Sequence, residues 1–387
     1  MVGYVYMMFT KTADQIWDMI LNNPPFVIAE AGKNFIMTMG ERSVEDYLRN
    51  AKLLVDEAVA AGAHAIKFQT HTVEDEQLNL AIESPHFKGG DRFKWVTRNT
   101  LATPLEEFWK PLKQYCDQKG IIFFSTPMTR ESAKKLAQLD VQLWKVGSAD
   151  ILDFVLLDYL RNTGKPILIS SGMSTLDEVK RAVNFIKEKN DRVLVFHCVS
   201  RYPCPPESLR LGTINYLRQE FPGTPIGFSD HSIGQDGIMA DLIATGLGVN
   251  SIEKHFSIGR DIYGADHKVS MTPDELEQLM KGIECMKTDE AYKNEIMSSE
   301  WAQRAQEVEV KELQNEESAF PGIFRKSLMA SRDIKAGEVV TKEMLYAMRP
   351  YIFAGGLPTS HEYVLILGKT VTKDLKKYDP ITTACFD

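Results

Sequence analysis

The sequence predicts an α/β protein with a closed (β/α)8 barrel of the TIM type and a small C-terminal domain. Short apolar runs alternate with helical patterns over about 260 residues, and such a regular alternation is typical of a parallel barrel. Each run ends in polar residues, and barrel enzymes place their active sites at the C-terminal ends of their strands. The expected regions are an N-terminal arm (1–23), the barrel (24–288), a linker (289–325) and the C-terminal domain (326–387).

Eight strands are expected from the apolar runs at 26–30, 65–70, 121–126, 143–147, 167–170, 193–198, 225–229 and 251–256. Helical patterns accompany them at 43–61, 105–119, 131–139, 153–162, 175–189, 208–220, 235–247 and 273–287. An open doubly wound sheet is the alternative. No GxGxxG motif follows the first strand, which argues against a dinucleotide-binding sheet.

The C-terminal domain is expected to open with a strand at 327–331, followed by a turn at 333–338 and a short helix after 341–343. A unit of about sixty residues is only marginally stable alone. We therefore expect this domain to dock on the barrel or on a partner subunit.

Composition argues against several classes of partner. The 387 residues are 44% hydrophobic and carry a net charge of -8 without a long basic run, so nucleic acid is not expected. No window holds the roughly eighteen apolar residues of a membrane span. The five cysteines form no CxxC pair, so we expect a reducing cytoplasm rather than disulfides. The apolar segment 1–10 is interpreted as an appended strand or arm.

Two histidines lie at the ends of neighbouring expected strands. His231 and His255 are 24 residues apart, which suits the same level of adjacent strands in a barrel. Imidazoles at such positions are ligands for a divalent metal. The alternative is that each is a hydrogen-bonded core histidine.

Lysines and hydroxyl groups follow several other strands. Lys67 and Lys145 stand at strand ends, with Ser148, Ser170 and Ser229 in the same expected ring. This combination suits a phosphate or phospho-carboxylate, because anionic oxygens accept several charge-assisted hydrogen bonds at once. A Schiff-base lysine is the rival use of either residue.

Carboxylates complete the predicted site. Glu30 ends the first strand and can serve proton transfer. Asp266 lies in the loop after the eighth strand, where it can bind a hydroxyl group, act as a base or only form a turn.

A set of motifs recurs at the strand ends in a fixed order: FVIAEAG from Phe26, AIKFQTH from Ala65, FSTP from Phe124, KVGS from Lys145, SSGM from Ser170, HC at His197, GFSDH from Gly227, EKHF from Glu253 and GAD from Gly264. In order and spacing, over residues 24–385, this set resembles the sialic acid (N-acetylneuraminate) synthase family. The C-terminal domain resembles the antifreeze-like (SAF) domain of that family. The resemblance implies a transferase of sialic acid biosynthesis that condenses phosphoenolpyruvate with an N-acetylmannosamine-like aldose, giving a nonulosonic acid and phosphate, on a TIM barrel with Mn²⁺ or Mg²⁺.

The resemblance also implies roles for individual residues. His231 and His255 would bind the metal, and Glu30 would act near the reacting centre. Phosphoenolpyruvate would be held by Lys67, Thr126, Lys145, Ser148, Ser170 and Ser229, and the sugar would be faced by Gln69, Tyr202 and Asp266. In the family the C-terminal domain reaches across a domain-swapped homodimer, so Arg349 would close the sugar site of the neighbour.

Three stretches depart from the family pattern. Asp150 stands where Glu is common, which shortens a carboxylate expected to contact the sugar, and Ser200 stands beside an expected phosphate contact where Asn or Thr is frequent. The segment from Arg349 to Pro358 replaces a shorter glycine loop. The alternatives within this class are a legionaminic or pseudaminic acid synthase and a synthase for a 6-phosphorylated sugar. Outside it are a Schiff-base barrel aldolase that uses Lys145 and a non-catalytic sugar-binding protein.

Overall fold

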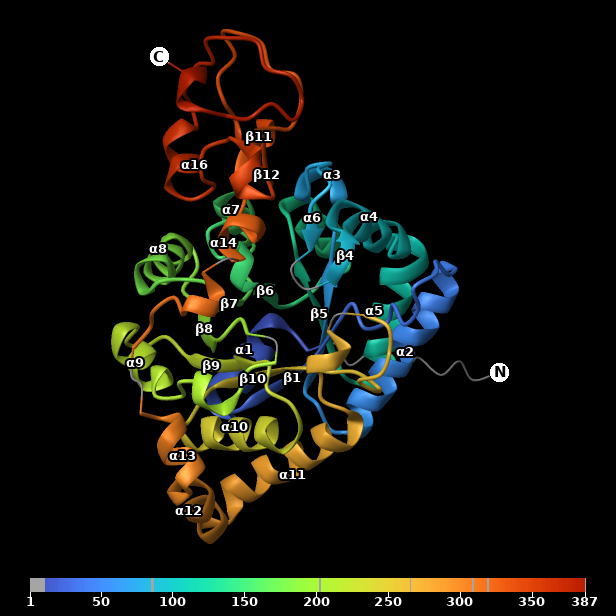
Figure 1. The fold of residues 1–387 in the computed structure, drawn as a ribbon, viewed down its shortest axis with the longest axis vertical. Coiled ribbons are helices and arrows are strands. Elements are labelled where there is room, and N and C mark those ends of the chain that lie inside the picture. The colour runs from blue at the N-terminus through green and yellow to red at the C-terminus, as the bar shows by residue number, and fades with distance from the viewer. Residues whose placement is uncertain are drawn as a thin grey trace.

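The computed structural model describes residues 11–84, 87–201, 203–264, 266–307, 310–318 and 320–386. Eight parallel strands form one sheet in the order β5-β2-β1-β10-β9-β8-β7-β6. Strands β5 and β6 lie next to each other at the ends of this order, so the sheet is a nearly closed barrel, although no ladder joins these two strands in the described part of the chain. The predicted barrel is confirmed (Figure 1).

The barrel strands differ from the expected runs by at most two residues at either end. They are β1 (Phe26–Gly32), β2 (Ala65–Thr70), β5 (Ile122–Pro127), β6 (Trp144–Val146), β7 (Ile167–Ser170), β8 (Val193–Cys198), β9 (Ile226–Asp230) and β10 (Ser251–His255). Every residue of β1, β7 and β8 is buried, as expected for parallel strands that are covered on both faces.

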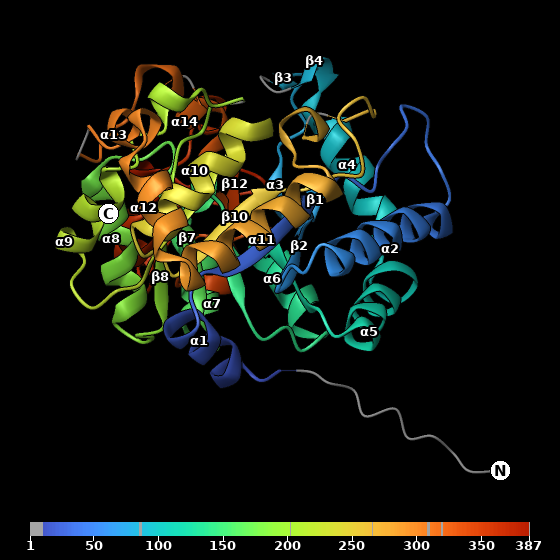
Figure 2. The same ribbon diagram turned by 90° about the horizontal axis from the view of Figure 1, so that it is seen from below.

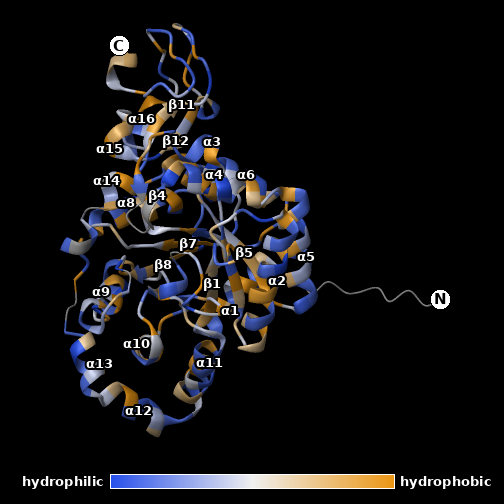
Figure 3. Cartoon of the chain, turned by 45° about the vertical axis from the view of Figure 1, so that its right-hand side comes forward, coloured by the Kyte–Doolittle hydropathy of each residue, from blue (hydrophilic) through white to orange (hydrophobic). Residues whose placement is uncertain are grey.

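Helices surround the strands (Figure 2). They are α2 (Val44–Ala60), α5 (Lys110–Lys119), α6 (Arg130–Ala137), α7 (Phe154–Arg161), α8 (Leu176–Lys187), α9 (Thr213–Glu220), α10 (Gly234–Gly246) and α11 (Pro273–Thr288). Apolar residues gather on the strands and on the helix faces that cover them (Figure 3). The described helices include none with the length and apolar character of a membrane span.

The N-terminal arm contains a helix that the sequence analysis did not predict. Helix α1 (Ala13–Asn22) begins at a capping box between Thr12 and Gln15. Its buried Ile16 and Ile20 pack with residues near the starts of several barrel strands, so α1 covers the N-terminal end of the barrel. The expected strand or arm at 1–10 lies outside the described residues.

An excursion between β2 and α5 was also missed. It contains α3 (Val73–Glu76), the hairpin of β3 (Glu83–Ser84) and β4 (Phe87–Asp91), and α4 (Arg92–Ala102). The expected helix at 105–119 begins with a π-helical stretch (Leu105–Trp109) and continues as α5.

Helices α12 (Glu290–Ser298), α13 (Glu300–Ala305) and α14 (Phe320–Phe324) lead to the C-terminal domain. In that domain β11 (Ser327–Ala330) pairs antiparallel with β12 (Leu345–Met348), next to α15 (Tyr351–Ala354) and α16 (His361–Ile366). The domain stands at one end of the molecule and docks on α3 and α7 of its own barrel (Figure 1). The expected opening strand is confirmed, and the expected short helix is the 3-10 turn Lys342–Met344.

Candidate active site

The C-terminal ends of the barrel strands surround a cavity of about 380 Å³. Parallel strands bring their C-terminal residues to one end of a barrel, so residues far apart in sequence meet there. Ser200 is buried beside Ser148 at this end, and the predicted Tyr202 lies outside the described residues. The other predicted site residues all line the cavity: Glu30, Lys67, Gln69, Thr126, Lys145, Ser148, Asp150, Ser170, Ser229, His231, His255, Asp266 and Arg349.

The two predicted anion-binding lysines lie side by side with carboxylates at the floor of the cavity. Lys67 Nζ donates to Thr126 Oγ1 at 2.9 Å and lies 2.6 Å from Glu30 Oε2. Lys145 Nζ donates to Ser170 Oγ at 2.7 Å and lies 3.3 Å from Glu253 Oε1. Both ammonium groups are thus fixed by a hydroxyl group and a carboxylate.

Burial acts differently on these two lysines. It opposes the charge of Lys67, but Glu253 and Glu30 outweigh it and raise the pKa of this lysine. At Lys145 burial dominates and lowers the pKa, although Glu253 acts in the opposite direction. Glu253, which the sequence analysis did not assign to the site, therefore balances the charge of both lysines.

His231 and His255 meet at the edge of the same cavity. Their ring centroids are 5.1 Å apart at an interplanar angle of 45°. His231 Nδ1 bonds the Val199 carbonyl at 2.8 Å, and because a carbonyl only accepts, Nδ1 carries the proton and Nε2 holds the lone pair. Burial, and then the neighbouring His255, lower the pKa of His231 well below its ordinary value, so the ring is neutral.

The donor set of this pair fits a metal ion. Neutral imidazoles whose other nitrogen is fixed by a carbonyl are common metal ligands. His255 Nδ1 is buried without a hydrogen-bond partner in the described part of the chain. That region contains no arrangement of three or more His, Cys, Asp or Glu residues that would hold a metal, so the pair would share an ion with water or substrate.

A glycine makes room for two predicted hydroxyl groups. A Cβ atom at Gly172 would lie 2.4 Å from Ser200 Oγ and 2.6 Å from Ser148 Oγ. The two serine hydroxyl groups therefore occupy the space that a side chain at Gly172, just after β7, would need. Ser148 Oγ also donates to Cys198 Sγ at 3.6 Å.

The predicted sugar contacts gather above Glu30. Gln69 Nε2 donates to Glu30 Oε1 at 2.8 Å. A Cβ atom at Gly32, whose φ is +51°, would lie 3.2 Å from Gln69 Nε2 and 3.6 Å from Asp266 Oδ2. A larger residue at this left-handed position would be strained, and the glycine lets Gln69 and Asp266 approach each other.

Asp150 binds the C-terminal domain. Its Oδ1 accepts from Arg349 Nη2 at 2.6 Å and lies 2.9 Å from Lys326 Nζ. The sequence analysis predicted that Arg349 closes the site of a neighbouring subunit. In the single chain of this structure, Arg349 lines the cavity of its own barrel.

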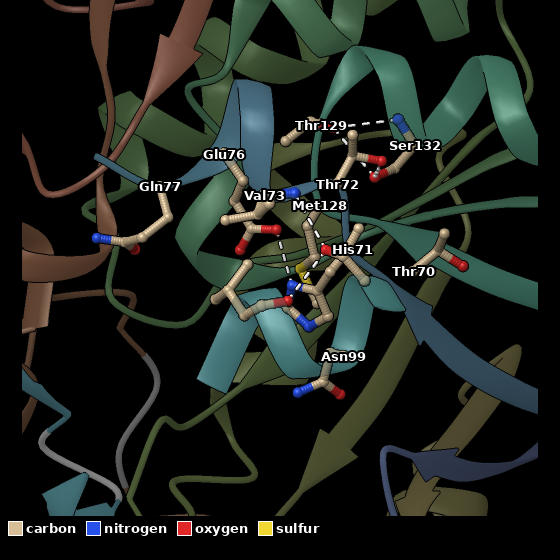
Figure 4. A network of polar contacts seen from close by, with 12 residues as sticks. Thr70, His71, Thr72, Val73, Glu76, Gln77, Asn99, Met128, Thr129 and Ser132 are labelled. Atoms are coloured by element: carbon tan, nitrogen blue, oxygen red, sulfur yellow. Dashed lines mark hydrogen bonds and ion pairs between the residues drawn. The ribbon is translucent and has the colours of Figure 1, made fainter. Parts of the chain in front are cut away.

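His71 and Glu76 belong to a buried polar network (Figure 4), and Glu76 also approaches Arg349. His71 Nδ1 and Glu76 Oε2 are 2.7 Å apart, and Glu76 Oε1 lies 3.9 Å from both Arg92 Nη2 and Arg349 Nε. Burial opposes the charge of Glu76, but His71 and the two guanidinium groups outweigh it and lower its pKa. The charged carboxylate holds two arginines at the cavity wall.

Sequence reasoning missed several residues that line the cavity: Lys33, His71, Arg92, Glu253 and Lys268. Lys33, His71 and Lys268 lie within three residues in sequence of residues that were selected, so this proximity in sequence was a usable signal. Arg92 belongs to the unpredicted excursion and had no such signal.

Residues 54–295 match the NeuB family model, which is more than half of the chain. The chain belongs to the NeuB family. Residues 325–387 match the SAF domain model. The predicted family and the C-terminal domain type are confirmed.

Three similar proteins match most of the chain. A spore coat polysaccharide biosynthesis protein, SpsE, from Bacillus subtilis superposes with a TM-score of 0.74 at 29% identity, covering 94% of this chain and 95% of its own. An N,N'-diacetyllegionaminic acid synthase from Campylobacter jejuni is 30% identical over 91% of this chain and 97% of its own length. An N-acetylneuraminate-9-phosphate synthase from Homo sapiens is 29% identical over 84% of this chain and 82% of its own.

Membership of the NeuB family confirms the prediction of an enzyme of the nonulosonic acid synthase class. The names of the two synthases give different sugar acids as their products. Family membership therefore identifies neither the sugar nor the metal nor the role of each residue, and proposals about them rest on the geometry of the cavity.

Proposed function

We propose that this enzyme condenses phosphoenolpyruvate with N-acetylmannosamine or a similar 2-acetamido aldose, giving a nonulosonic acid and phosphate in a metal-dependent reaction. The observation that carries the proposal is the placement of Lys67, Lys145 and the His231–His255 pair around one cavity. An anion site beside a metal site is what this condensation needs.

Phosphoenolpyruvate would bind at the floor of the cavity. Lys67 and Lys145 supply two buried ammonium groups, and the hydroxyl groups of the following residues add neutral donors: Thr126, Ser148, Ser170, Ser200 and Ser229. Glu30 and Glu253 balance the lysines before the substrate arrives, so they keep the buried site from carrying a large uncompensated charge.

His231 and His255 would hold a divalent cation, Mn²⁺ or Mg²⁺, at the side of this anion site. When bound there, the cation would polarise the carbonyl oxygen of the open-chain aldose. The hydrogen bond from His231 Nδ1 to Val199 keeps the ring in the tautomer that presents Nε2.

The aldose would bind on the outer side of phosphoenolpyruvate, whose enol group reacts with it. Gln69 and Asp266 would bind its hydroxyl groups, together with Tyr202, while Arg349 and its partner Asp150 would form the far wall. C3 of the enol then bonds to the aldehyde carbon, water adds at C2, and phosphate leaves with its bridging oxygen by cleavage of the C–O bond. Glu30 stands beside Lys67 and Gln69, where a carboxylate can accept or return the proton of the reacting groups.

The experiment is phosphate release from phosphoenolpyruvate with a panel of 2-acetamido aldoses and added Mn²⁺. Phosphate release that requires an aldose and ceases after chelation supports the proposal. At subsaturating phosphoenolpyruvate, Lys67→Met should slow phosphate release about tenfold to a hundredfold, while Lys373→Met, at an exposed lysine of the C-terminal domain, should not slow it. In ¹⁸O-labelled water the label should enter the sugar acid, because C–O cleavage leaves the original oxygen on phosphate.

A Schiff-base aldolase is the second candidate, because burial lowers the pKa of Lys145 and a neutral amine is nucleophilic. Borohydride trapping of pyruvate on wild-type enzyme, lost in Lys145→Met, would favour the aldolase. Phosphate release without trapping would favour the synthase.

The proposal includes a domain-swapped homodimer. The surfaces that dock the C-terminal domain on its own barrel can also pair between two copies of the chain. If they do, Arg349→Ala and His231→Ala enzymes are each nearly inactive, but exchanged heterodimers regain activity at one of two sites. Absence of recovery after proven subunit exchange would place Arg349 in its own barrel.

A further inference from the structure

We propose that Glu317, in the linker between the barrel and the C-terminal domain, is a positioning residue of the phosphoenolpyruvate site. Its carboxylate holds two loops of the barrel together, so that Ser148 and Ser200 present their hydroxyl groups to the anion. This role rests on the proposed function and extends the anion site to a segment outside the barrel.

Glu317 joins the loops that follow β7 and β8. Its Oε1 accepts from the backbone N–H of Met173 at 2.9 Å and from that of Ser200 at 2.8 Å. Glu317 is 1% exposed, and hydrogen bonds from backbone N–H groups to a carboxylate are among the stronger ones in proteins. The two loops are therefore tied to each other through one buried oxygen atom.

The two tied positions adjoin hydroxyl groups of the anion site. Ser148 Oγ and Ser200 Oγ occupy the space beside Gly172, the residue before Met173. Ser200 Oγ is buried without a hydrogen-bond partner among the residues that the structure describes. Glu317 thus holds the backbone of Ser200, while the hydroxyl group of this serine remains available to an anionic oxygen.

Met173 has a backbone conformation that needs support. Its φ is +52°, in the left-handed region that is unfavourable for a residue with a side chain. Glu317 accepts from its N–H, and Arg325 Nη2 donates to its carbonyl at 2.9 Å and to Ser174 Oγ at 2.8 Å. Two linker residues therefore fix both backbone groups of a residue that lines the cavity.

A local capping role does not account for these contacts. Glu317 ends the 3-10 helix Asn315–Glu317, where its Oε2 accepts from the Gln314 N–H at 3.3 Å. That bond uses the other carboxylate oxygen and does not require a buried side chain. The two bonds from Oε1 to the barrel loops therefore need a separate explanation.

The linker is anchored to the barrel before it reaches Glu317. Thr213 Oγ1 donates to the Val310 carbonyl at 2.7 Å, and Gln314 Nε2 donates to the Ser208 carbonyl at 3.2 Å. Glu317 also precedes α14 and the C-terminal domain. Its contact with the two loops therefore belongs to the linker and can persist when the C-terminal domain is undocked.

The first measurement is hydrogen exchange at the amides of Met173 and Ser200 in the full-length protein. In Glu317→Ala both amides should exchange about tenfold to a hundredfold faster, the size expected when a hydrogen bond to a charged acceptor is lost. Glu317→Gln should retain most of the protection, because its amide oxygen still accepts. The matched control is Glu312→Ala in the same linker, where the carboxylate pairs with Arg210 and is 59% exposed. This control should leave both amides unchanged.

The second measurement compares the KM for phosphoenolpyruvate with the KM for the aldose. Glu317→Ala should raise the KM for phosphoenolpyruvate about tenfold and leave that for the aldose almost unchanged, and Glu317→Gln should restore the first value. A role in folding alone would reduce the amount of active enzyme without separating the two KM values. Glu317→Asp is the second variant: it keeps the charge but is one methylene shorter, so it should lose at least one of the two bonds and separate the KM values in the same way.

Unchanged exchange in Glu317→Ala and Glu317→Asp, or faster exchange with an unchanged KM for phosphoenolpyruvate, would overturn the inference while leaving the synthase intact. If no aldose supports phosphate release, the proposed function fails instead. Calorimetric titration with phosphoenolpyruvate and with inorganic phosphate then replaces the kinetic measurement. Weaker binding of either in Glu317→Ala supports the positioning role, whereas binding that is absent, or equal in wild type and variant, contradicts it.

Discussion

Asp150→Asn should loosen the docking of the C-terminal domain, because this carboxylate joins two cations across the contact with the barrel. Asp150, Arg349 and Lys326 are 1%, 2% and 3% exposed. The substitution keeps the shape of the side chain and removes its charge. Arg349 is then left with Glu76 at 3.9 Å, and Lys326 with Asp153 at 2.8 Å.

The size of the effect follows from burial. Removing one partner of a buried ion pair costs about 3–5 kcal/mol, and a single hydrogen bond to a charged group contributes about 1.5–3 kcal/mol. The asparagine oxygen can still accept from Arg349, so we expect a loss of about 3 kcal/mol in docking free energy. This corresponds to roughly a hundredfold increase in the undocked population.

Hydrogen exchange measures that population directly at two amides of the contact. Arg349 N–H donates to the Glu76 carbonyl, and Leu78 N–H donates to the Arg349 carbonyl. Both amides should exchange about a hundredfold faster in Asp150→Asn, because undocking breaks both bonds at once.

The matched control is Asp333→Asn in the same domain. Asp333 pairs with Lys376 at 3.0 Å, but the side chains of Asp333 and Lys376 are 56% and 72% exposed, and an exposed pair contributes about 0–1 kcal/mol. Exchange at Leu78 and Arg349 that is no faster in Asp150→Asn than in this control would refute the reasoning. Acceleration that depends on protein concentration would indicate that the contact forms between two chains.

Other predictions concern metal, anion and pH. His231→Ala and His255→Ala should each abolish activity and metal binding in a metal titration while the circular dichroism spectrum is retained; near-normal turnover of His255→Ala in metal-depleted buffer would contradict the ligand role. Lys67→Met and Lys145→Met should each weaken phosphoenolpyruvate binding about tenfold to a hundredfold in steady-state kinetics, and a fall in sugar affinity alone would reassign these lysines. Burial raises the pKa of Asp75 to about 7. The folded state therefore retains a proton that the unfolded chain loses near pH 4, and this carboxyl group should lower the free energy of unfolding by up to about 4 kcal/mol as the pH rises from 4 to 7. In Asp75→Asn, the free energy of unfolding obtained from urea unfolding curves should fall less steeply between pH 4 and 7. The same pH dependence in variant and wild type would show that Asp75 is ionised throughout.

The barrel was predictable because its strands obey a local rule. Buried parallel strands form short apolar runs, and the polar residues that end them must face one end of the barrel, so Lys67, Lys145, His231 and His255 could be selected without coordinates. The same rule explains why Glu30 was found. None of these inferences required knowledge of a distant contact.

The missed parts depend on contacts that no local pattern encodes. Arg92 reaches the cavity through the excursion between β2 and α5, which has no strand-and-helix alternation to place it. Asp150 was expected to contact the sugar, but its partner Arg349 is 199 residues away in sequence. Sequence spacing cannot reveal which carboxylate forms an ion pair with a guanidinium group so far away in the chain.

The arrangement around Arg349 links docking of the C-terminal domain to the sugar end of the cavity. Arg349 contributes to the cavity wall only while Asp150 and Glu76 hold it there. The floor residues Lys67 and Lys145 belong to the barrel alone and keep their partners whether the domain is docked or not. By linkage, a sugar that touches Arg349 must stabilise docking to the same extent that docking strengthens sugar binding, whereas phosphoenolpyruvate binding at the floor should be almost independent of it. Under the proposed function, the C-terminal domain should therefore act on acceptor affinity, equally whether it belongs to the same chain or to a second copy.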